Sequence, residues 1–141
     1  MSTAYANCDR VHISETVYNP PVKPEKLIEA VEWLDEDVIN YLTPKVLKSK
    51  PNTYTYTKAI AEYLVIQECK NIPCAIIRPS IIGATWREPF PGWVDGWNGP
   101  TALFPAVGTG LLRSMLGTYD ATSDLIPVDV SVNLMITGNK I

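Results

Sequence analysis

The sequence predicts an α/β fold in which helices cover a doubly wound parallel sheet. Two helical patterns are followed by residues 74–77, Cys-Ala-Ile-Ile, a short continuous apolar run that is typical of a buried parallel strand. A long loop rich in proline and glycine comes next. Helix, buried strand and loop in this order are characteristic of open α/β sheets. With 141 residues, of which 46% are hydrophobic, the chain can form one packed domain at most.

The first helical pattern begins at Pro24, because proline is well tolerated at the first position of a helix. Apolar residues then recur every three or four positions with glutamates between them, which predicts an amphipathic helix with a solvated acidic face. Thr43-Pro44 is expected to end or kink this helix. The segment before it, residues 1–7, is interpreted as the end of a strand running into a loop. The apolar positions of the helix are Leu27, Val31, Leu34 and Val38.

The second helical pattern runs from Tyr54 to about Glu68, and either Asn52 or Thr53 can cap it. Because the pattern is apolar on more than one side, we expect this helix to be largely buried or to lie in a subunit interface, as in a homo-oligomer. Three weaker elements are predicted further along the chain. These are a helical turn at residues 111–115, a short strand at 124–128, and a helix from Val130 capped by Asp129.

Composition and charge exclude several classes of function. The net charge of −3 and the isoelectric point near 5.1 argue against nucleic acid as a main partner, because phosphate binding needs clustered lysine and arginine. No apolar run reaches the roughly 18–20 residues of a membrane helix, and no targeting signal is visible. The single histidine, His12, cannot build a catalytic triad or a zinc site alone. We therefore expect it on a surface loop, and we expect no metal site.

The sharpest chemical signal is the spacing Tyr54-x-x-x-Lys58. Residues four apart share one face of a helix, so the phenol and the ammonium are expected to project side by side. A free phenol is a weak acid near neutral pH, and a neighbouring ammonium favours the phenolate. A place in the first helical turn favours the phenolate further, by a smaller amount. The pair therefore predicts a general acid.

Two further segments give this pair its context. Ser2-Thr3 lies upstream, at the predicted end of a strand, and Arg-Pro-Ser-Ile-Ile-Gly at residues 78–83 lies downstream. Ligands of open α/β sheets bind beyond the carboxyl ends of the strands. In this order the three signals resemble the extended short-chain dehydrogenase/reductases. Four stretches resemble more closely the alcohol-forming fatty acyl-CoA reductases, and the phrase at residues 86–93 is the most specific of them. The stretches are residues 2–7, 51–62, 78–97 and 124–133.

The resemblance implies roles for individual residues. Tyr54 would donate a proton to the substrate oxygen, and Lys58 would hold the ribose hydroxyls of the nicotinamide cofactor and tune Tyr54. Thr3, or less readily Ser2, would hydrogen-bond the same substrate oxygen. Backbone groups of one later segment would contact the nicotinamide, namely those of Pro79, Ser80, Ile81 and Ile82.

The implied reaction is the reduction of a long-chain fatty acyl-CoA by NADPH, first to an aldehyde and then to a fatty alcohol. Residues 1–136 would form part of an NAD(P)-binding reductase domain, and residues 137–141 a divergent tail. No Gly-x-x-Gly-x-x-Gly loop follows a strand anywhere in the sequence, although this family uses one to cradle the cofactor's pyrophosphate. The chain is therefore expected to be the carboxyl-terminal half of a Rossmann-type sheet whose amino-terminal half is missing.

Two alternatives to a working acyl-CoA reductase stay open. In the first, the chain is a catalytically inactive truncated product or an interaction-only fragment. An incomplete sheet would expose an unpaired edge, which favours inactivity of the isolated chain. Alternatively, it belongs to a reductase that acts on another thioester or on a nucleotide sugar. The loop rich in tryptophan argues against a nucleotide sugar.

The aromatic loop has two interpretations. Its side chains either line a groove for an acyl chain or touch a membrane surface, or they cover the core beneath a long loop. The resemblance implies a protein that faces the cytoplasm at the membrane of peroxisomes or of the endoplasmic reticulum, with peripheral membrane contact. The aromatic residues are Trp86, Phe90, Trp93 and Trp97.

Overall fold

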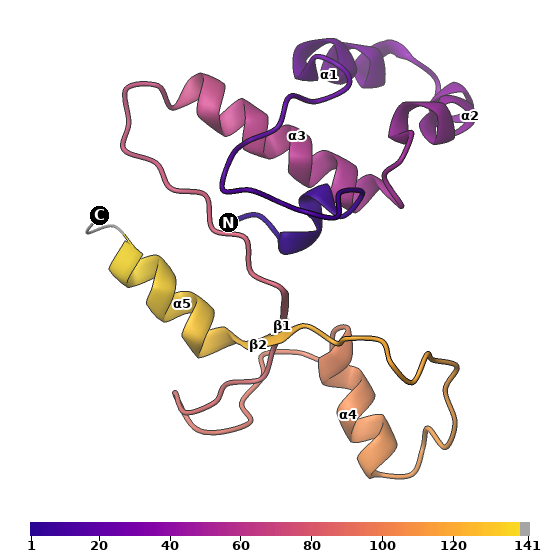
Figure 1. Cartoon of the computed structure of the whole chain (residues 1–141). Coiled ribbons are helices and arrows are strands. Elements are labelled where there is room, and N and C mark those ends of the chain that lie inside the picture. Colours follow the sequence, from indigo (N-terminus) through magenta and orange to yellow (C-terminus); the bar gives the residue numbers. More distant parts are fainter. Residues whose placement is uncertain (139–141) are drawn as a thin grey trace. The chain divides into compact units, whose positions relative to one another are not determined.

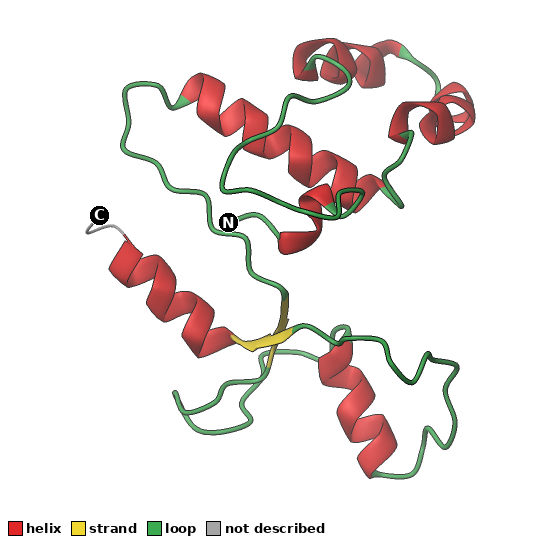
Figure 2. Ribbon diagram, viewed as in Figure 1, coloured by secondary structure: helices red, strands yellow, loops and turns green. Residues whose placement is uncertain are grey.

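The computed structural model describes residues 1–138 and divides the chain into two compact units, Met1–Arg78 and Pro79–Ile141 (Figure 1). Figure 2 shows the first unit as helices and loops, and the two strands in the second. The first unit contains η1 (Ala4–Asn7), α1 (Pro24–Trp33), α2 (Glu36–Leu47) and α3 (Thr53–Glu68). The second contains β1 (Ile81–Gly83), α4 (Pro100–Gly108), β2 (Leu125–Pro127) and α5 (Val128–Thr137).

The two strands of the second unit form a small parallel sheet. Ile81 pairs with Leu125 and Gly83 pairs with Pro127, and the Ile81 N–H also donates to the Asp124 carbonyl at 3.1 Å. Parallel neighbours need a long crossover, and the segment that contains α4 provides it. The α/β class is therefore confirmed, and the arrangement is consistent with part of a Rossmann-type NAD(P)-binding domain. The strand predicted at 124–128 is also confirmed.

The strand predicted at residues 74–77 is wrong, because the first strand lies at 81–83 instead. A strand needs a partner along its length. The backbone of residues 74–77 makes one bond outside its own segment, from the Ser2 N–H to the Ile77 carbonyl at 2.8 Å. Residues 81–83, in contrast, meet the whole of β2. Residues 1–7 also differ from the prediction, since Thr3 is extended but a short 3₁₀ helix follows it.

The first helical pattern forms two helices rather than one. The break comes at Leu34 and Asp35, whose backbones are both extended, and not at Pro44, which lies inside α2. Proline there removes one bond from the helical ladder. A turn between α1 and α2 lets both apolar stripes face α3, whereas one straight helix would carry part of its stripe past α3.

Helix α3 is the centre of the first unit and begins where the sequence predicts. Asn52 is its N-cap, and its Oδ1 accepts from the Thr55 N–H at 2.9 Å. Tyr56 and Ile60 are buried on this helix, and Ala6 of η1, which packs against α3, is also buried. None of the helices within residues 1–138 is long and apolar enough to cross a membrane.

Two predictions for the second unit need correction. Residues 111–115 form no helical turn, and the helix of this region is α4, at residues 100–108, within what was predicted to be loop. Proline at its first position favours that start, as it does for α1. Asp129 lies inside α5 and makes no capping bond, because its carboxylate binds the loop at residues 86–88 instead. Residues 137–141, the predicted tail, lie mostly outside the described residues.

Candidate functional site

Tyr54 and Lys58 project from the same face of α3. The Nζ atom of Lys58 lies 5.9 Å from the centroid of the Tyr54 ring, as expected for residues one turn apart. Tyr54 is 55% exposed, so its hydroxyl is accessible from solvent. Lys58 is half-buried, and its ammonium forms no ion pair or hydrogen bond with any residue between 1 and 138. The face therefore offers an accessible phenol beside an available cation.

The two upstream hydroxyls lie in different local environments. Thr3 is buried and caps η1, with its Oγ1 accepting from the Tyr5 N–H at 3.3 Å. Ser2 is also buried, but its Oγ has no hydrogen-bond partner among the described residues. Both hydroxyls directly precede η1, and η1 packs on α3, the helix of Tyr54 and Lys58.

Ser2 and Lys58 line one hollow of about 170 Å³ in the first unit, together with Glu62 and apolar side chains. Thr3 and Tyr54 are not among its lining residues. An available ammonium can donate hydrogen bonds to neighbouring hydroxyls of a polyhydroxyl compound. Lys58 thus fits a sugar ring such as the ribose of a nicotinamide cofactor.

Sequence reasoning missed a clamp on the same helix face. Glu62, one turn after Lys58, binds Arg78 in a two-point ion pair, Nε to Oε1 at 2.8 Å and Nη2 to Oε2 at 2.7 Å. The guanidinium also donates to the carbonyls of Ser14 and Thr16, at 3.2 and 2.7 Å. The periodicity of Tyr54, Lys58 and Glu62 was visible in the sequence and could have pointed to this buried carboxylate.

Burial and hydrogen bonding act in opposite directions on Glu62. Burial is the largest single effect and raises the pKa of this carboxyl, but the hydrogen bonds and positive charges around it, first among them those of Arg78, together outweigh burial, so the pKa lies below its ordinary value. The Glu62 side chain is only 2% exposed. The clamp therefore holds an ionised carboxylate inside the unit and ties two segments of chain, the one that carries Arg78 and the loop at residues 14–16, to α3.

The segment predicted to contact the nicotinamide lies in the second unit. Pro79 is buried, Ser80 is half-buried, and Ile81 and Ile82 belong to β1. Some of their backbone groups are used in the sheet, as the bond from the Ile81 N–H to Asp124 shows. The fold thus brings Tyr54, Lys58, Ser2 and Thr3 into one unit.

The aromatic loop of the second unit is held at two points. Thr85 is buried at its base, where its hydroxyl donates to the Phe90 carbonyl at 2.6 Å and accepts from the Trp93 N–H at 3.0 Å. Asp129 holds the other side through three successive backbone amides. Its carboxylate accepts from Trp86 at 2.9 Å, from Arg87 at 2.9 Å and from Glu88 at 3.3 Å.

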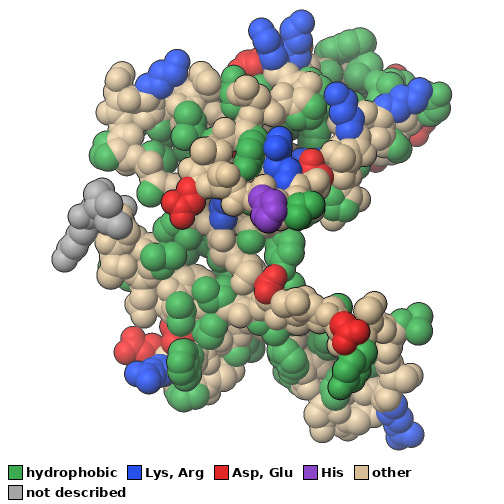
Figure 3. All heavy atoms as spheres, viewed as in Figure 1, with side chains coloured by type: hydrophobic (Ala, Val, Ile, Leu, Met, Phe, Trp, Pro, Cys, Tyr) green, Lys and Arg blue, Asp and Glu red, His purple; other side chains and the backbone are tan. Residues whose placement is uncertain are grey.

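This loop presents rather than buries its aromatic side chains. Trp86 is 63% exposed, Phe90 59% and Trp97 69%, while Trp93 is 37% exposed. Apolar side chains are visible across the surface in Figure 3. The interpretation that the loop merely covers the core therefore does not hold for these side chains.

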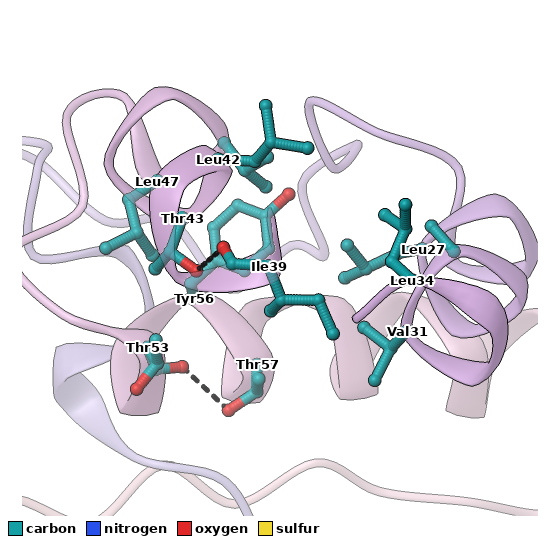
Figure 4. Close-up of a pocket in the computed structure, with 12 residues that line it drawn as sticks. Leu27, Val31, Leu34, Ile39, Leu42, Thr43, Leu47, Thr53, Tyr56 and Thr57 are labelled. Carbon is teal, nitrogen blue, oxygen red and sulfur yellow. Dashed lines mark hydrogen bonds between the residues drawn. The ribbon is translucent and has the colours of Figure 1, made fainter. Parts of the chain in front are cut away.

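An apolar pocket of about 210 Å³ lies among α1, α2 and α3 (Figure 4). Leu27, Leu34 and Leu42 line it, and Tyr56 of α3 projects into it on the side of Leu42. Tyr56 is two residues from Tyr54, and residues at this spacing do not face each other on a helix. The pocket is therefore separate from the Tyr54–Lys58 face.

The described part of the chain contains no group of three or more His, Cys, Asp or Glu side chains that could hold a metal ion. His12 lies exposed in a loop, as predicted, and is the purple side chain in Figure 3.

Comparison with known proteins places these features in a family. The family model described as "Male sterility protein", an NAD-binding domain, matches residues 1–135. Fatty acyl-CoA reductase 1 of Xenopus laevis is 59% identical over 98% of the chain, and that of Homo sapiens is 55% identical over the same share. Fatty acyl-CoA reductase 2 of Homo sapiens is 54% identical over 96% of the chain.

The chain spans 27% of the length of the first two of these relatives and 26% of the third. No solved structure matches it significantly. The resemblance inferred from the sequence is confirmed by these matches. The chain belongs to the male sterility protein family of NAD-binding domains, and it is similar to one stretch of the fatty acyl-CoA reductases.

Proposed function

We propose that this chain forms the proton-donating part of a reductase that converts long-chain fatty acyl-CoA to fatty alcohol with NADPH. The observation that carries the proposal is the Tyr54–Lys58 pair on one accessible face of α3. The names of the relatives support the substrate, and the family model supports a nicotinamide cofactor. The choice of NADPH over NADH and the alcohol as end product follow from the family resemblance.

Each residue has a defined part in the proposed mechanism. Reduction of a thioester carbonyl develops negative charge on its oxygen, and hydrogen-bond donors placed at that oxygen stabilise the charge. Tyr54 donates its phenolic proton there, and Lys58 favours the phenolate that remains. Thr3 donates a second hydrogen bond, with Ser2 as the alternative donor. When bound, the nicotinamide supplies the hydride.

The ammonium of Lys58, which lines the hollow of about 170 Å³, is the group we assign to the ribose of the cofactor. Backbone groups of residues 79–82 would contact the nicotinamide ring. The exposed aromatic side chains of the second unit support a peripheral contact with a membrane, on the cytoplasmic face of peroxisomes or of the endoplasmic reticulum. The apolar sides of α3 are the basis for proposing a homo-oligomer.

The decisive experiment is Tyr54→Phe in the full-length protein, with palmitoyl-CoA and NADPH as substrates. We expect kcat to fall by roughly 100-fold or more, because the general acid is lost while the ring stays. Tyr41→Phe is the matched control, since Tyr41 is an exposed tyrosine of α2 in the same unit. Full turnover by the Tyr54 variant would remove the catalytic assignment. Activity on a nucleotide sugar but not on palmitoyl-CoA would replace the substrate.

A further inference from the structure

The second unit contains a hollow of about 310 Å³ at the carboxyl ends of its two strands. Gly83 ends β1 and Val128 directly follows β2, and both line the hollow. Trp93 lines it from the aromatic loop and Asn98 from the segment before α4. The carboxyl ends of parallel strands are where open α/β sheets bind their ligands. The position alone therefore favours a ligand site.

Two groups hold the loop wall of this hollow. Thr85 fixes Trp93 by donating its backbone N–H to the Trp93 carbonyl at 3.1 Å and by accepting the Trp93 N–H on its hydroxyl. Asp129 is adjacent in sequence to the lining residue Val128 and binds the other end of the loop through three amides. A carboxylate that accepts several backbone N–H groups makes strong, charge-assisted bonds.

We infer that Asp129 is a positioning residue that fixes one end of the loop at residues 86–93, whose other end, at Trp93, lines the acyl-CoA site. The inference rests on the proposed function and specifies the part of the site that holds the substrate. Because three consecutive amides converge on one side chain, the loop cannot change shape there without breaking the Asp129 bonds. Thr85, at the base of the same loop, keeps Trp93 at the wall of the hollow.

The chemistry of the hollow fits the region around the thioester of an acyl-CoA. Trp93 and Val128 offer apolar surface to the acyl chain. Asn98 is exposed and lines the hollow, so its side-chain amide can pair with an amide of the pantetheine arm. An acyl-CoA carries an apolar acyl chain on one side of its thioester and the amides of the pantetheine arm on the other. The lining offers an apolar surface and a side-chain amide to these two parts.

The test uses Asp129→Asn in the full-length protein, which keeps the size of the side chain and removes its charge. Asp120→Asn is the matched control, an exposed aspartate in a turn of the same unit. The first readout is trypsin cleavage after Arg87, which should accelerate when the loop is released. The second is the KM for palmitoyl-CoA, which should rise by roughly tenfold with little change in kcat. The neutral amide of asparagine binds the loop amides more weakly than the carboxylate does, and the loop is expected to contribute to substrate binding and not to the chemical step.

Each outcome decides the inference. Unchanged cleavage shows that Asp129 does not hold the loop, and faster cleavage with an unchanged KM shows that the loop is not a wall of the site. Either result overturns the inference. Should the Asp129 variant fail to fold, Trp93→Leu tests the same wall, and an unchanged KM for palmitoyl-CoA overturns the inference.

The proposed reaction can fail separately. Absence of palmitoyl-CoA reduction by the wild-type protein would overturn the proposed function. The inference would then be judged by direct binding of palmitoyl-CoA, followed through tryptophan fluorescence. Weaker binding to the Asp129→Asn protein than to the Asp120→Asn protein supports it, and equal binding overturns it.

Discussion

The two units each fix a loop with a single carboxylate, but they use different donors. In Met1–Arg78 the carboxylate of Glu62 is bound by the guanidinium of Arg78, at 2.8 and 2.7 Å. In the second unit the carboxylate of Asp129 is bound by backbone amides of residues 86–88. The first arrangement depends on the identity of a second side chain. The second depends only on the path of the backbone, so the side chains of the loop are free to serve another purpose.

Hydrogen bonding lowers the pKa of both carboxyls, but from different sources. The pKa of Asp129 lies below its ordinary value chiefly because the Trp86 N–H binds the ionised form, with Arg87 and Glu88 adding to it. Glu62 must also overcome its own burial. Loss of a donor therefore leaves a buried unpaired charge in the first unit and a more accessible one in the second.

The largest effect is expected for Arg78→Met. Removing the guanidinium leaves the buried Glu62 carboxylate without its partner. The free energy of unfolding of the first unit should therefore fall by about 3–5 kcal/mol. Hydrogen exchange of the α3 amides in the full-length protein measures this loss.

Arg87→Ala is the matched control from the second unit. Arg87 contributes its backbone N–H to Asp129, which alanine retains, so the cost should stay within about 0.5 kcal/mol. Equal losses of stability in Arg78→Met and Arg87→Ala would contradict the comparison. They would show that the second unit also depends on an arginine side chain and not on the backbone amide alone.

An intermediate effect is expected from acid. The pKa of Glu62 is lower in the folded chain than its unfolded value of about 4.5, so the clamp contributes its full stability above pH 4.5. This contribution is lost as the pH falls through the lower folded-state pKa. Exchange of the α3 amides, measured between pH 6 and pH 3, should therefore reveal an acid-induced loss of protection after correction for the intrinsic rate.

Glu62→Gln tests the origin of the acid effect, because glutamine cannot titrate. The variant should be less stable at pH 6, and its stability should depend less on pH over the same range. An unaltered pH profile in this variant would assign the acid effect to another carboxylate, such as Asp9, whose pKa is also lowered by its hydrogen bond to Lys50.

The smallest effect is expected for Asn52→Ala, which removes the N-cap of α3. Loss of the bond to the Thr55 N–H should cost about 1 kcal/mol, because that amide loses its partner at the helix start. Asn52→Asp retains a capping oxygen and should cost much less. Exchange of the first-turn amides of α3 separates the two variants, and equal exchange would show that the cap does not stabilise the helix.

Local signals in the sequence located the helix of Tyr54 and Lys58 well. Asn52 as the cap, the extent of α3 and the shared face of Tyr54 and Lys58 all follow from contacts within a few residues, and the structure agrees with each. The roles of Ser2 and Thr3 at the substrate oxygen stay predictions. The family itself was also recognisable from short phrases, because they are specific in residue type and spacing.

Long-range contacts account for what the sequence did not determine. An apolar run at 74–77 and another at 81–83 are equally strand-like, and only the partner at 125–127 decided which of them pairs. Likewise, nothing local shows that Glu62 meets Arg78, 16 residues away, or that Asp129 binds amides more than 40 residues upstream.

The sequence by itself thus determined the helix of Tyr54 and Lys58 and the class of fold. The tertiary structure alone decided the strand register, the clamp on α3 and the held aromatic loop. The physical reason is that helix capping and side-chain spacing act within a few residues. Strand pairing and carboxylate binding instead join segments that only the folded chain brings together.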